Sequence, residues 1–264
     1  MKARRWLERN AIRIYAVIAF GYLFVPVAYT LAFSFNDSGK SNIAWRGFTL
    51  DKWKNPCGAP DVCPALGNSL KIGLLATLIA TVLGTMIAFA LARHRFRGRT
   101  ATNLTIFLPM ATPEVVLGAS LLALFLNLKI NLGFNTIVIA HVMFCISFVV
   151  VTVKARIAGL DPRLEQAAMD LYADEFQTFR RITLPLVAPG IAAGALLAFS
   201  LSFDDFIITN FNSGSVNTFP KFIWVSSLRG IPAQANVIAS SMFFIALIAV
   251  LFGQAVTSRK KQRA

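Results

Sequence analysis

The sequence predicts an all-α integral membrane protein with six transmembrane helices. Of its 264 residues, 56% are hydrophobic and only 14% are charged, which is too apolar for a water-soluble chain of this length. A helix needs about 20 apolar residues to cross a hydrocarbon core of roughly 30 Å. The stretches that meet this requirement lie at about 12–33, 69–92, 101–126, 135–158, 187–211 and 236–257. Together they occupy more than half of the chain, so we expect a single membrane domain, residues 1–264.

The distribution of charge predicts how this domain is oriented. The formal net charge is +14, and with the N-terminus placed inside, most of the 26 lysines and arginines fall on the cytoplasmic side. This bias fixes the topology of membrane helices and predicts that both termini are cytoplasmic. The basic ends are expected to contact anionic lipid headgroups. A basic patch is the only feature that would favour nucleic acid, so we expect no nucleic-acid partner.

The first apolar stretch is expected to remain as a helix, because it is longer than the apolar part of a signal peptide and lacks a convincing cleavage site. An external loop at 34–67 follows, and it is long enough for a short helix and for contact with an external partner. Within this loop Cys57 and Cys63 are either a possible disulfide, in an oxidising compartment, or two independent thiols. Cys145 is expected to pack as a small apolar residue.

Three later regions depart from a simple pattern of helices and loops. The loop at 93–99 is short and basic, as expected of an anchor on the cytoplasmic side. The third apolar stretch contains Pro109 and Pro113, which remove backbone donors and are expected to kink or break the helix. Region 212–235 is neither a clean loop nor a full span. We expect a short segment there that dips toward the membrane or lies at its interface.

Side-chain constellations for catalysis are missing from the sequence. His141 and Cys145 share a helix face at i, i+4, but a zinc site needs three or four ligands and no further ligand completes this one. We therefore expect no metal, and a packed or hydrogen-bonded role for His141. The phosphate-binding pattern Gly-x4-Gly-Lys-Ser/Thr is absent, so any ATP-driven role depends on a partner that hydrolyses ATP.

Three acidic side chains are expected near the middle of the membrane. At 1.5 Å per residue, Glu114 in the third stretch and Asp204 and Asp205 in the fifth lie roughly 20 Å above the cytoplasmic entry. Because an uncompensated charge there costs about 3 kcal/mol or more, each acid should face a cavity, a cation or a partner. We infer a cation pathway, chiefly through Glu114 and Asp205. The alternative is that the aspartates cap a broken helix or pair with Lys221 or Arg229.

Residues 164–189 form the most informative segment, a polar helix-turn-helix pattern set between apolar stretches. A loop that only joins two spans needs no amphipathic helix of its own. The first helix is expected from about 163 to 172 and the second from 175 to 182. The residues that can share one helical face are Glu165, Ala168, Leu171 and Tyr172. We expect a docking surface for a cytoplasmic partner here, and the alternative is a solvated hairpin.

This segment resembles the signature of the inner-membrane permease subunits of binding-protein-dependent ABC importers, a cytoplasmic loop of form Glu-Ala-Ala-x3-Gly-x9-Ile-x-Leu-Pro. Here the loop reads Gln166-Ala167-Ala168-Met169-Asp170-Leu171-Tyr172, then nine residues, then Ile182-Thr183-Leu184-Pro185. Glutamine and tyrosine replace the usual glutamate and glycine, and the tyrosine fits this turn if the turn uses negative φ.

In that family the loop carries a coupling helix that sits in a groove of the ATPase subunit. The resemblance implies the type I importer architecture, with a coupling loop at about 159–186. The coupling residues that it implies are Glu165, Gln166, Ala167, Ala168, Asp170 and Tyr172.

Softer motifs are similar to the polyamine branch of this family, namely those of the spermidine/putrescine importers. They are Phe33-Ser34-Phe35-Asn36, Phe96-Arg97-Gly98, the run from Ala198 to Phe206, Phe211-x-Ser213-Gly214 and Phe219-Pro220. A polyamine is a flexible polycation whose ammonium groups suit carboxylates and aromatic faces. Glu114, Asp204, Asp205 and Trp224 are the pathway residues on this interpretation.

The resemblance implies a permease that is not itself an enzyme, in a bacterial inner membrane. Its implied partners are a homologous permease, two copies of an ATPase that bind ATP and Mg²⁺, and an extracytoplasmic substrate-binding protein. This chain itself is expected to hold no cofactor. The alternatives are the same role for ferric ion, sulfate or a phosphonate, or a proton-coupled secondary transporter.

Overall fold

The computed structural model describes residues 2–39 and 41–261, and within these ranges the protein is helical. The only pairing of extended chain in the described part is an isolated antiparallel bridge between Asn36 and Phe48. In order along the chain, the elements are α1 (Lys2–Phe33), α2 (Asp51–Lys54), α3 (Val62–Arg93), α4 (Arg99–Ala111), α5 (Glu114–Asn127), α6 (Phe134–Ala158), α7 (Arg163–Asp170), α8 (Glu175–Thr178), the π-helix η1 (Phe179–Thr183), α9 (Leu184–Asp204), α10 (Ile207–Asn212), α11 (Phe219–Arg229) and α12 (Ala233–Lys261).

The expected membrane spans are confirmed. Among the described residues, five helices are long and apolar enough to cross a membrane, and there are six if the bent pair α4–α5 is one span. These helices fall on the six apolar stretches of the sequence. Region 212–235, which was expected to hold a short segment, contains the 11-residue helix α11.

The third span is broken where proline was expected to break it. Helices α4 and α5 meet at 108°. Thr112 adopts extended backbone (φ −83°, ψ 132°) immediately before Pro113, because the proline ring disfavours helical geometry in the preceding residue. Pro109 instead lies inside α4 without ending it. The fifth span is also interrupted: α9 ends at Asp204, and α10 begins three residues later.

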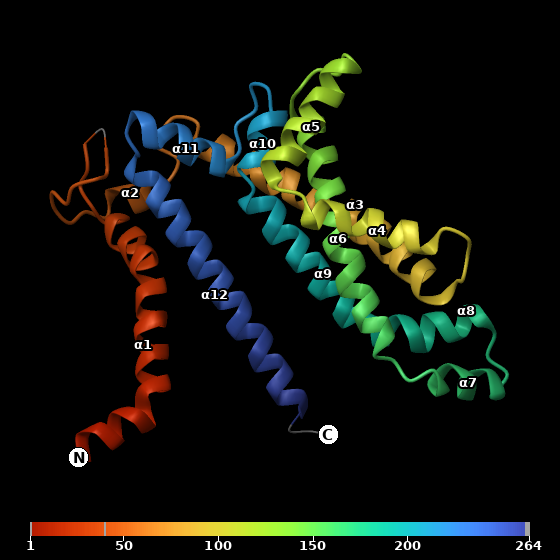
Figure 1. Cartoon of the computed structure of the whole chain (residues 1–264). Coiled ribbons are helices and arrows are strands. Elements are labelled where there is room, and N and C mark those ends of the chain that lie inside the picture. Colours follow the sequence, from red (N-terminus) through yellow and green to blue (C-terminus); the bar gives the residue numbers. More distant parts are fainter. Residues whose placement is uncertain (1, 40, 262–264) are drawn as a thin grey trace. The chain divides into compact units, whose positions relative to one another are not determined.

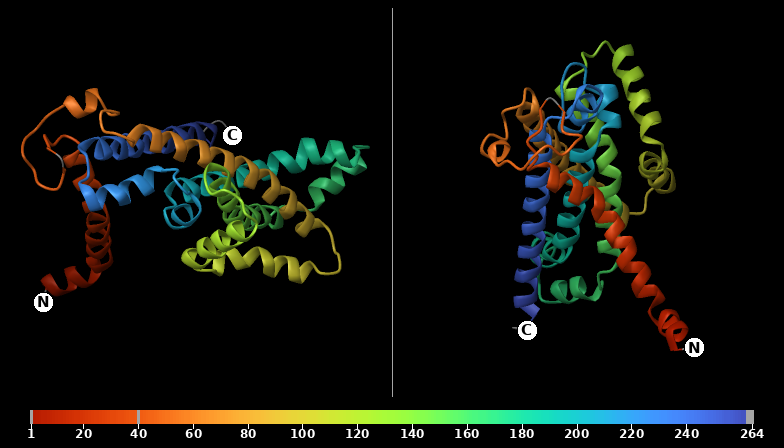
Figure 2. Two further views of the ribbon diagram at one scale, coloured as in Figure 1. Left: turned by 90° about the horizontal axis from the view of Figure 1, so that it is seen from above. Right: turned by 90° about the vertical axis from the view of Figure 1, so that its left-hand side faces the viewer.

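The helices group into two compact units, one of residues 1–63 and 223–264 and the other of residues 64–222. In the larger unit α6 packs against both α9 and α4, and Figures 1 and 2 show α6 and α9 running side by side. The core around α6 combines small and β-branched side chains, among them Ala140, Val149 and Ala198, with larger ones such as Phe125 and Phe144.

Glycines allow two helices to approach α6 closely. A Cβ atom at Gly84 of α3 would lie 2.8 Å from Val149 Cγ1, and one at Gly190 of α9 would lie 2.6 Å from Arg156 Cβ. Both distances are far below van der Waals contact, so neither position accepts a side chain without movement of α6. Small residues at helix contacts are what permits close packing in a membrane, where no hydrophobic effect drives helices together.

The smaller unit consists of α1 and α12 with an ordered loop between α1 and α2. The side chain of Asn36 holds this loop: its Nδ2 donates to Asn42 Oδ1 (2.6 Å) and Ala44 O (2.8 Å), and its Oδ1 accepts from Arg46 N (2.8 Å). Cys57 and Cys63 are joined by a disulfide, with 5.4 Å between their Cα atoms.

We expect Gly84→Ala to lower the thermal stability of the protein in detergent, because the added methyl overlaps Val149. Overpacking of this kind typically costs about 1–3 kcal/mol, which exceeds the gain of about 1 kcal/mol in helix propensity. Gly67→Ala is the matched control in the same helix, since a Cβ there meets nothing within 4 Å. A Gly84→Ala protein that melts at or above the temperature of Gly67→Ala would contradict this packing.

Candidate functional site

Residues 163–183, comprising α7, α8 and η1, form a compact segment between α6 and α9, hereafter the α7–η1 segment (Figure 1). Its two short helices begin where the sequence predicted, at Arg163 and Glu175, but α7 ends two residues early and α8 passes into the π-helix η1 at Phe179. Asp174 caps α8, since its Oδ1 accepts from Gln177 N at 2.7 Å, as a side-chain oxygen does at a helix N-cap. The π-helix η1 then runs directly into α9 without a loop, so movement of the segment passes to the fifth span.

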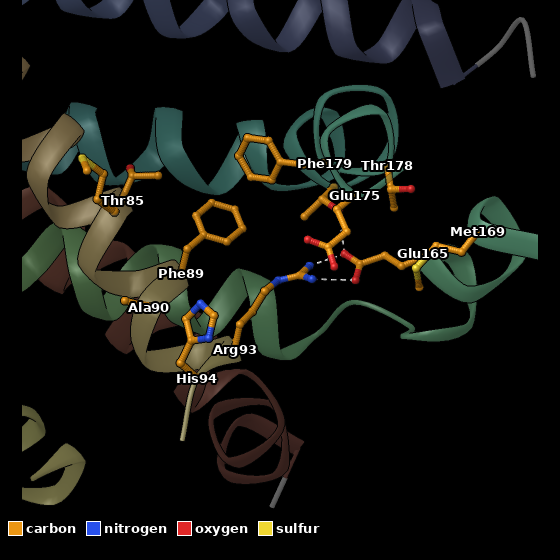
Figure 3. A pocket seen from close by; sticks show the side chains of 12 residues that line it. Thr85, Phe89, Ala90, Arg93, His94, Glu165, Met169, Glu175, Thr178 and Phe179 are labelled. Atoms are coloured by element: carbon orange, nitrogen blue, oxygen red, sulfur yellow. Dashed lines mark hydrogen bonds and ion pairs between the residues drawn. The ribbon is translucent and has the colours of Figure 1, made fainter. Parts of the chain in front are cut away.

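An ion pair joins this segment to the end of α3. Arg93 Nη1 donates to Glu165 Oε2 at 2.8 Å and Arg93 Nη2 pairs with Oε1, while Thr183 Oγ1 donates to the same Oε1 at 2.5 Å (Figure 3). The hydrogen bond from Arg93 holds the pKa of Glu165 below its ordinary value, against the opposing effect of partial burial. A bidentate arginine–carboxylate pair fixes geometry as well as charge. We call these three side chains the Arg93–Glu165–Thr183 clasp.

The six residues implied for coupling lie on two sides of the segment. Glu165 is half-buried in the clasp and Ala168 is buried. Gln166, Ala167, Asp170 and Tyr172 are exposed. The expectation that Glu165, Ala168, Leu171 and Tyr172 share one helical face is wrong for Leu171 and Tyr172, because α7 ends at Asp170 and the helical periodicity ends with it.

The outer surface of the segment instead carries large apolar side chains. Leu171 is 80% exposed, Tyr172 98% and Phe176 69%, and Met169 and Leu164 are also exposed. The sequence-based interpretation missed Phe176, although an apolar residue two positions after an N-cap aspartate is visible in the sequence. Contiguous exposed apolar side chains on an otherwise polar segment mark an interaction surface.

Tyr172, two residues after the end of α7, adopts the left-handed conformation, with φ +61°, so the negative φ under which a tyrosine would fit this turn is not what the turn uses. Tyr172 N donates to Met169 O (3.0 Å) and Ala173 N to Ala168 O (3.1 Å). This hydrogen-bond pattern is a Schellman motif with Tyr172 at the position that glycine usually fills. Tyrosine therefore stands where the family signature has glycine, at the cost of backbone strain.

The three membrane acids gather where helices break. Glu114 is the first residue of α5, Asp204 is the last of α9, and Asp205 lies two residues before Ile207, the first residue of α10. Helix α5, which begins at Glu114, packs against α10. Glu114 and Asp204 are exposed, whereas the side chain of Asp205 is only 4% exposed.

Asp205 caps α10 from within the protein. Its Oδ1 accepts from Ile208 N (3.2 Å) and its Oδ2 from Thr209 N (2.7 Å), and Oδ2 lies 3.3 Å from His141 Nε2. His141 is 1% exposed, with Nδ1 2.7 Å from Ser202 Oγ. This arrangement is the helix-capping alternative considered above for the aspartates. Ser202 and Thr209 were not singled out by sequence, because nothing local relates them to a histidine in another helix.

The remaining side chains singled out by sequence lie elsewhere. Lys221 donates to Ser213 Oγ (2.7 Å) and to two loop carbonyls rather than to an aspartate. Trp224 lies on α11 and is half-exposed. Cys145 is buried, with its Sγ 3.4 Å from Ala198 O.

The left-handed residue generates a local prediction. Tyr172→Gly should strengthen the end of α7 by about 1 kcal/mol, because glycine adopts this φ without a steric penalty. Tyr172→Val should weaken it, since a β-branched side chain tolerates positive φ least. Hydrogen exchange at the amides of Tyr172 and Ala173, which donate the two closing bonds, measures both effects. Equal protection in the two variants would refute the left-handed cap.

The sequence of this chain matches a family of known proteins. The family model described as binding-protein-dependent transport system inner membrane component matches residues 80–262. The spermidine/putrescine transport system permease protein PotC of Haemophilus influenzae is 34% identical, over 97% of this chain and 98% of the relative. PotC of Escherichia coli K12 is 36% identical over 91% of each chain. The putrescine transport system permease protein PotI of that strain is 35% identical over 85% of this chain and 82% of its own.

Solved structures of low sequence identity share the fold. A chain of a bacterial ABC transporter involved in the import of the acidic polysaccharide alginate superposes with a TM-score of 0.69 at 14% identity, over 96% of this chain and 98% of that one. A chain of the MetNI methionine ABC transporter, in inward-facing conformations, gives 0.61 at 12% identity, over 74% and 94%. From the family match and the full-length relatives, this chain belongs to the inner membrane components of binding-protein-dependent transport systems.

Proposed function

We propose that this protein is a permease subunit of an ATP-driven importer of polyamines such as spermidine and putrescine. The observation that carries the proposal is the exposed apolar tip of the α7–η1 segment, which the clasp ties to a transmembrane helix. The names of the PotC and PotI relatives support polyamines as the substrate class. Ferric ion, sulfate or a phosphonate is the alternative cargo, and the exposed membrane acids favour a cation over the two anions. A proton-coupled secondary transporter would need no docking segment of this kind.

Leu171, Tyr172 and Phe176 form the surface that contacts the ATPase on this proposal, with Gln166, Ala167 and Asp170 at its edge. A partner that buries this tip gains the apolar area that the free chain leaves in water. The inward residues Glu165 and Ala168 then act indirectly, by holding the tip in place. ATP and Mg²⁺ bind the ATPase subunits, and this chain supplies the mechanical connection.

Movement of the docked tip has two routes into the membrane domain. One route is η1, which is continuous with α9. The other is the clasp, through which Glu165 pulls on Arg93 at the end of α3. Closure of the ATPase pair would therefore move α3 and α9 together, and α6 lies between glycine contacts from both helices. This coupling is the basis of alternating access in the proposed importer.

The remaining partners follow from the same assignment. The permease pairs with a homologous permease, and an extracytoplasmic binding protein delivers the substrate. The membrane is a bacterial inner membrane, and the concentration of arginines at the α7–η1 end supports a cytoplasmic position for that end and for both termini.

The cation pathway runs past Glu114 and Asp204 on this proposal, because these two acids are exposed. Asp205 contributes by fixing the break between α9 and α10 that presents Asp204. Trp224, half-exposed on α11, offers an aromatic face to an ammonium group.

We expect Leu171→Glu to weaken binding of the ATPase by about 2 kcal/mol or more, as for a central interface side chain. Leu171→Met, which keeps the position apolar, is the matched control and should bind normally. Co-purification of the ATPase from detergent-solubilised membranes measures the difference. If the glutamate variant inserts normally and still retains the ATPase, the apolar tip is not the docking surface.

Glu114→Gln and Asp204→Asn should each lower putrescine uptake by about tenfold, corresponding to roughly 1.4 kcal/mol of lost charge stabilisation in the pathway. Asp51→Asn removes one carboxylate from an exposed helix outside the spans and should leave uptake unchanged. Uptake into proteoliposomes, with assembly of the complex checked in parallel, is the measurement. Parental uptake rates in both pathway variants would exclude these acids from cation passage.

A further inference from the structure

A pocket of about 730 Å³ lies between the last turns of α3 and the α7–η1 segment (Figure 3). Phe89, Arg93 and His94 line it from the α3 side, and Glu165 and Glu175 line it from the segment. Its volume is within the range of small-molecule sites, about 300–1,000 Å³. Its lining includes the three clasp residues but neither the membrane acids nor the tip residues Leu171, Tyr172 and Phe176.

The charge of this pocket is opposite to that of its surroundings. Arg93 and Glu165 neutralise each other in the clasp. Glu175 forms no salt bridge with any described residue, so the fixed charge of the lining is negative. The adjacent chain is strongly basic, with arginines at 95, 97, 180 and 181. Within the lining, Glu175 is the carboxylate that is left to pair with a bound cation, because Glu165 is already paired with Arg93.

The remaining lining suits an alkyl chain that carries such a charge. Phe89 and Phe179 meet edge to face, with ring centroids 5.3 Å apart, and Met86 and Met169 extend the apolar wall. Aromatic faces attract ammonium groups and also pack against methylenes.

Two hydroxyls complete the set of acceptors. Thr178 is 6% exposed and lines the pocket, and its Oγ1 has no hydrogen-bond partner among the described residues. The Oγ1 of Thr85, on the opposite wall, is likewise buried without a partner in the described part of the chain. A buried hydroxyl without a partner is costly, and an ammonium N–H bound in the pocket would supply one.

We propose that this pocket binds a protonated diamine or polyamine, with an ammonium group on Glu175 and the methylenes across Phe89 and Phe179. The inference rests on the proposed function, because that function delivers such amines to this end of the protein. The two walls belong to α3 and to the segment that docks the ATPase. An amine that bridges them opposes their relative movement, so accumulated product slows the transport cycle from the cytoplasmic side.

Binding is tested on the complete complex in nanodiscs without the binding protein, with putrescine as the probe and 1,4-butanediol as its uncharged counterpart. Titration calorimetry should show saturable binding of putrescine and none of the diol. Glu175→Gln should weaken binding by about tenfold or more, the usual effect of losing a charge-assisted hydrogen bond. Asp174 still caps α8 in this variant, so the segment keeps its fold.

Asp161→Asn is the matched control, since it removes an exposed carboxylate near the same segment but outside the pocket lining; it should bind putrescine as the parent does. Phe179→Leu should weaken binding while it keeps the position apolar. Equal putrescine affinity in the parent and Glu175→Gln, or equal binding of the diol, overturns the proposal.

A second measurement separates this site from the proposed function. Putrescine enclosed on the cytoplasmic side of proteoliposomes should slow uptake by the parent, and should slow uptake by Glu175→Gln much less. If the parent transports no polyamine but still binds putrescine through Glu175, the proposed substrate fails and the pocket stands. If the parent transports putrescine and enclosed putrescine slows both proteins equally, the pocket has no regulatory role and the proposed function stands.

Discussion

The carboxylate of Glu165 connects three parts of the structure that are far apart in the sequence. It accepts from Arg93 at the end of α3 and from Thr183 at the end of η1, while its own backbone belongs to α7. Without it, the α7–η1 segment would be attached to the membrane domain through its two chain ends and the contact between Phe179 and Phe89. With it, the positions of the apolar tip and of the proposed amine pocket are both fixed relative to α3. A bidentate ion pair is suited to this task because it resists rotation as well as separation.

The three membrane acids have different roles because the side chain of Asp205 is buried and the other two are exposed. The side chain of Asp205 accepts hydrogen bonds from two backbone amides of α10 and lies beside His141. Asp204, the adjacent residue, points its charge to the surface, as does Glu114. Adjacent residues on an ordinary helix diverge by about 100°, and the break after Asp204 adds to this divergence. Asp205 therefore stabilises the break between α9 and α10, and the carboxylate of Asp204 is exposed to a ligand.

Much of this fold could be predicted from the sequence, and the failures have specific causes. Hydropathy located the spans because a bilayer demands a fixed length of apolar helix. The break before Pro113 was predictable because proline restricts the residue that precedes it. The break after Asp204 was only the alternative interpretation of the aspartates, because Asp205 lies beside His141, which is 64 positions away in the sequence. The face of α7 was misassigned because the helix ends two residues earlier than the pattern suggested, and the left-handed Tyr172 has no reliable signal in a single sequence.

The π-helix between the docking tip and the fifth span gives the spacing of the loop a geometric meaning. A π-helix holds one residue more per turn than an α-helix would at the same place. One turn covers 360° in either geometry, so this turn can absorb the loss of one residue from 179–183 by becoming α-helical, and the loss of a further residue would swing the tip about 100° around the axis of α9. The number of residues between Tyr172 and Ile182, which is nine, therefore determines the direction in which the tip faces its partner. The length of this loop is therefore constrained by the orientation of the tip and not by the distance that the loop has to span.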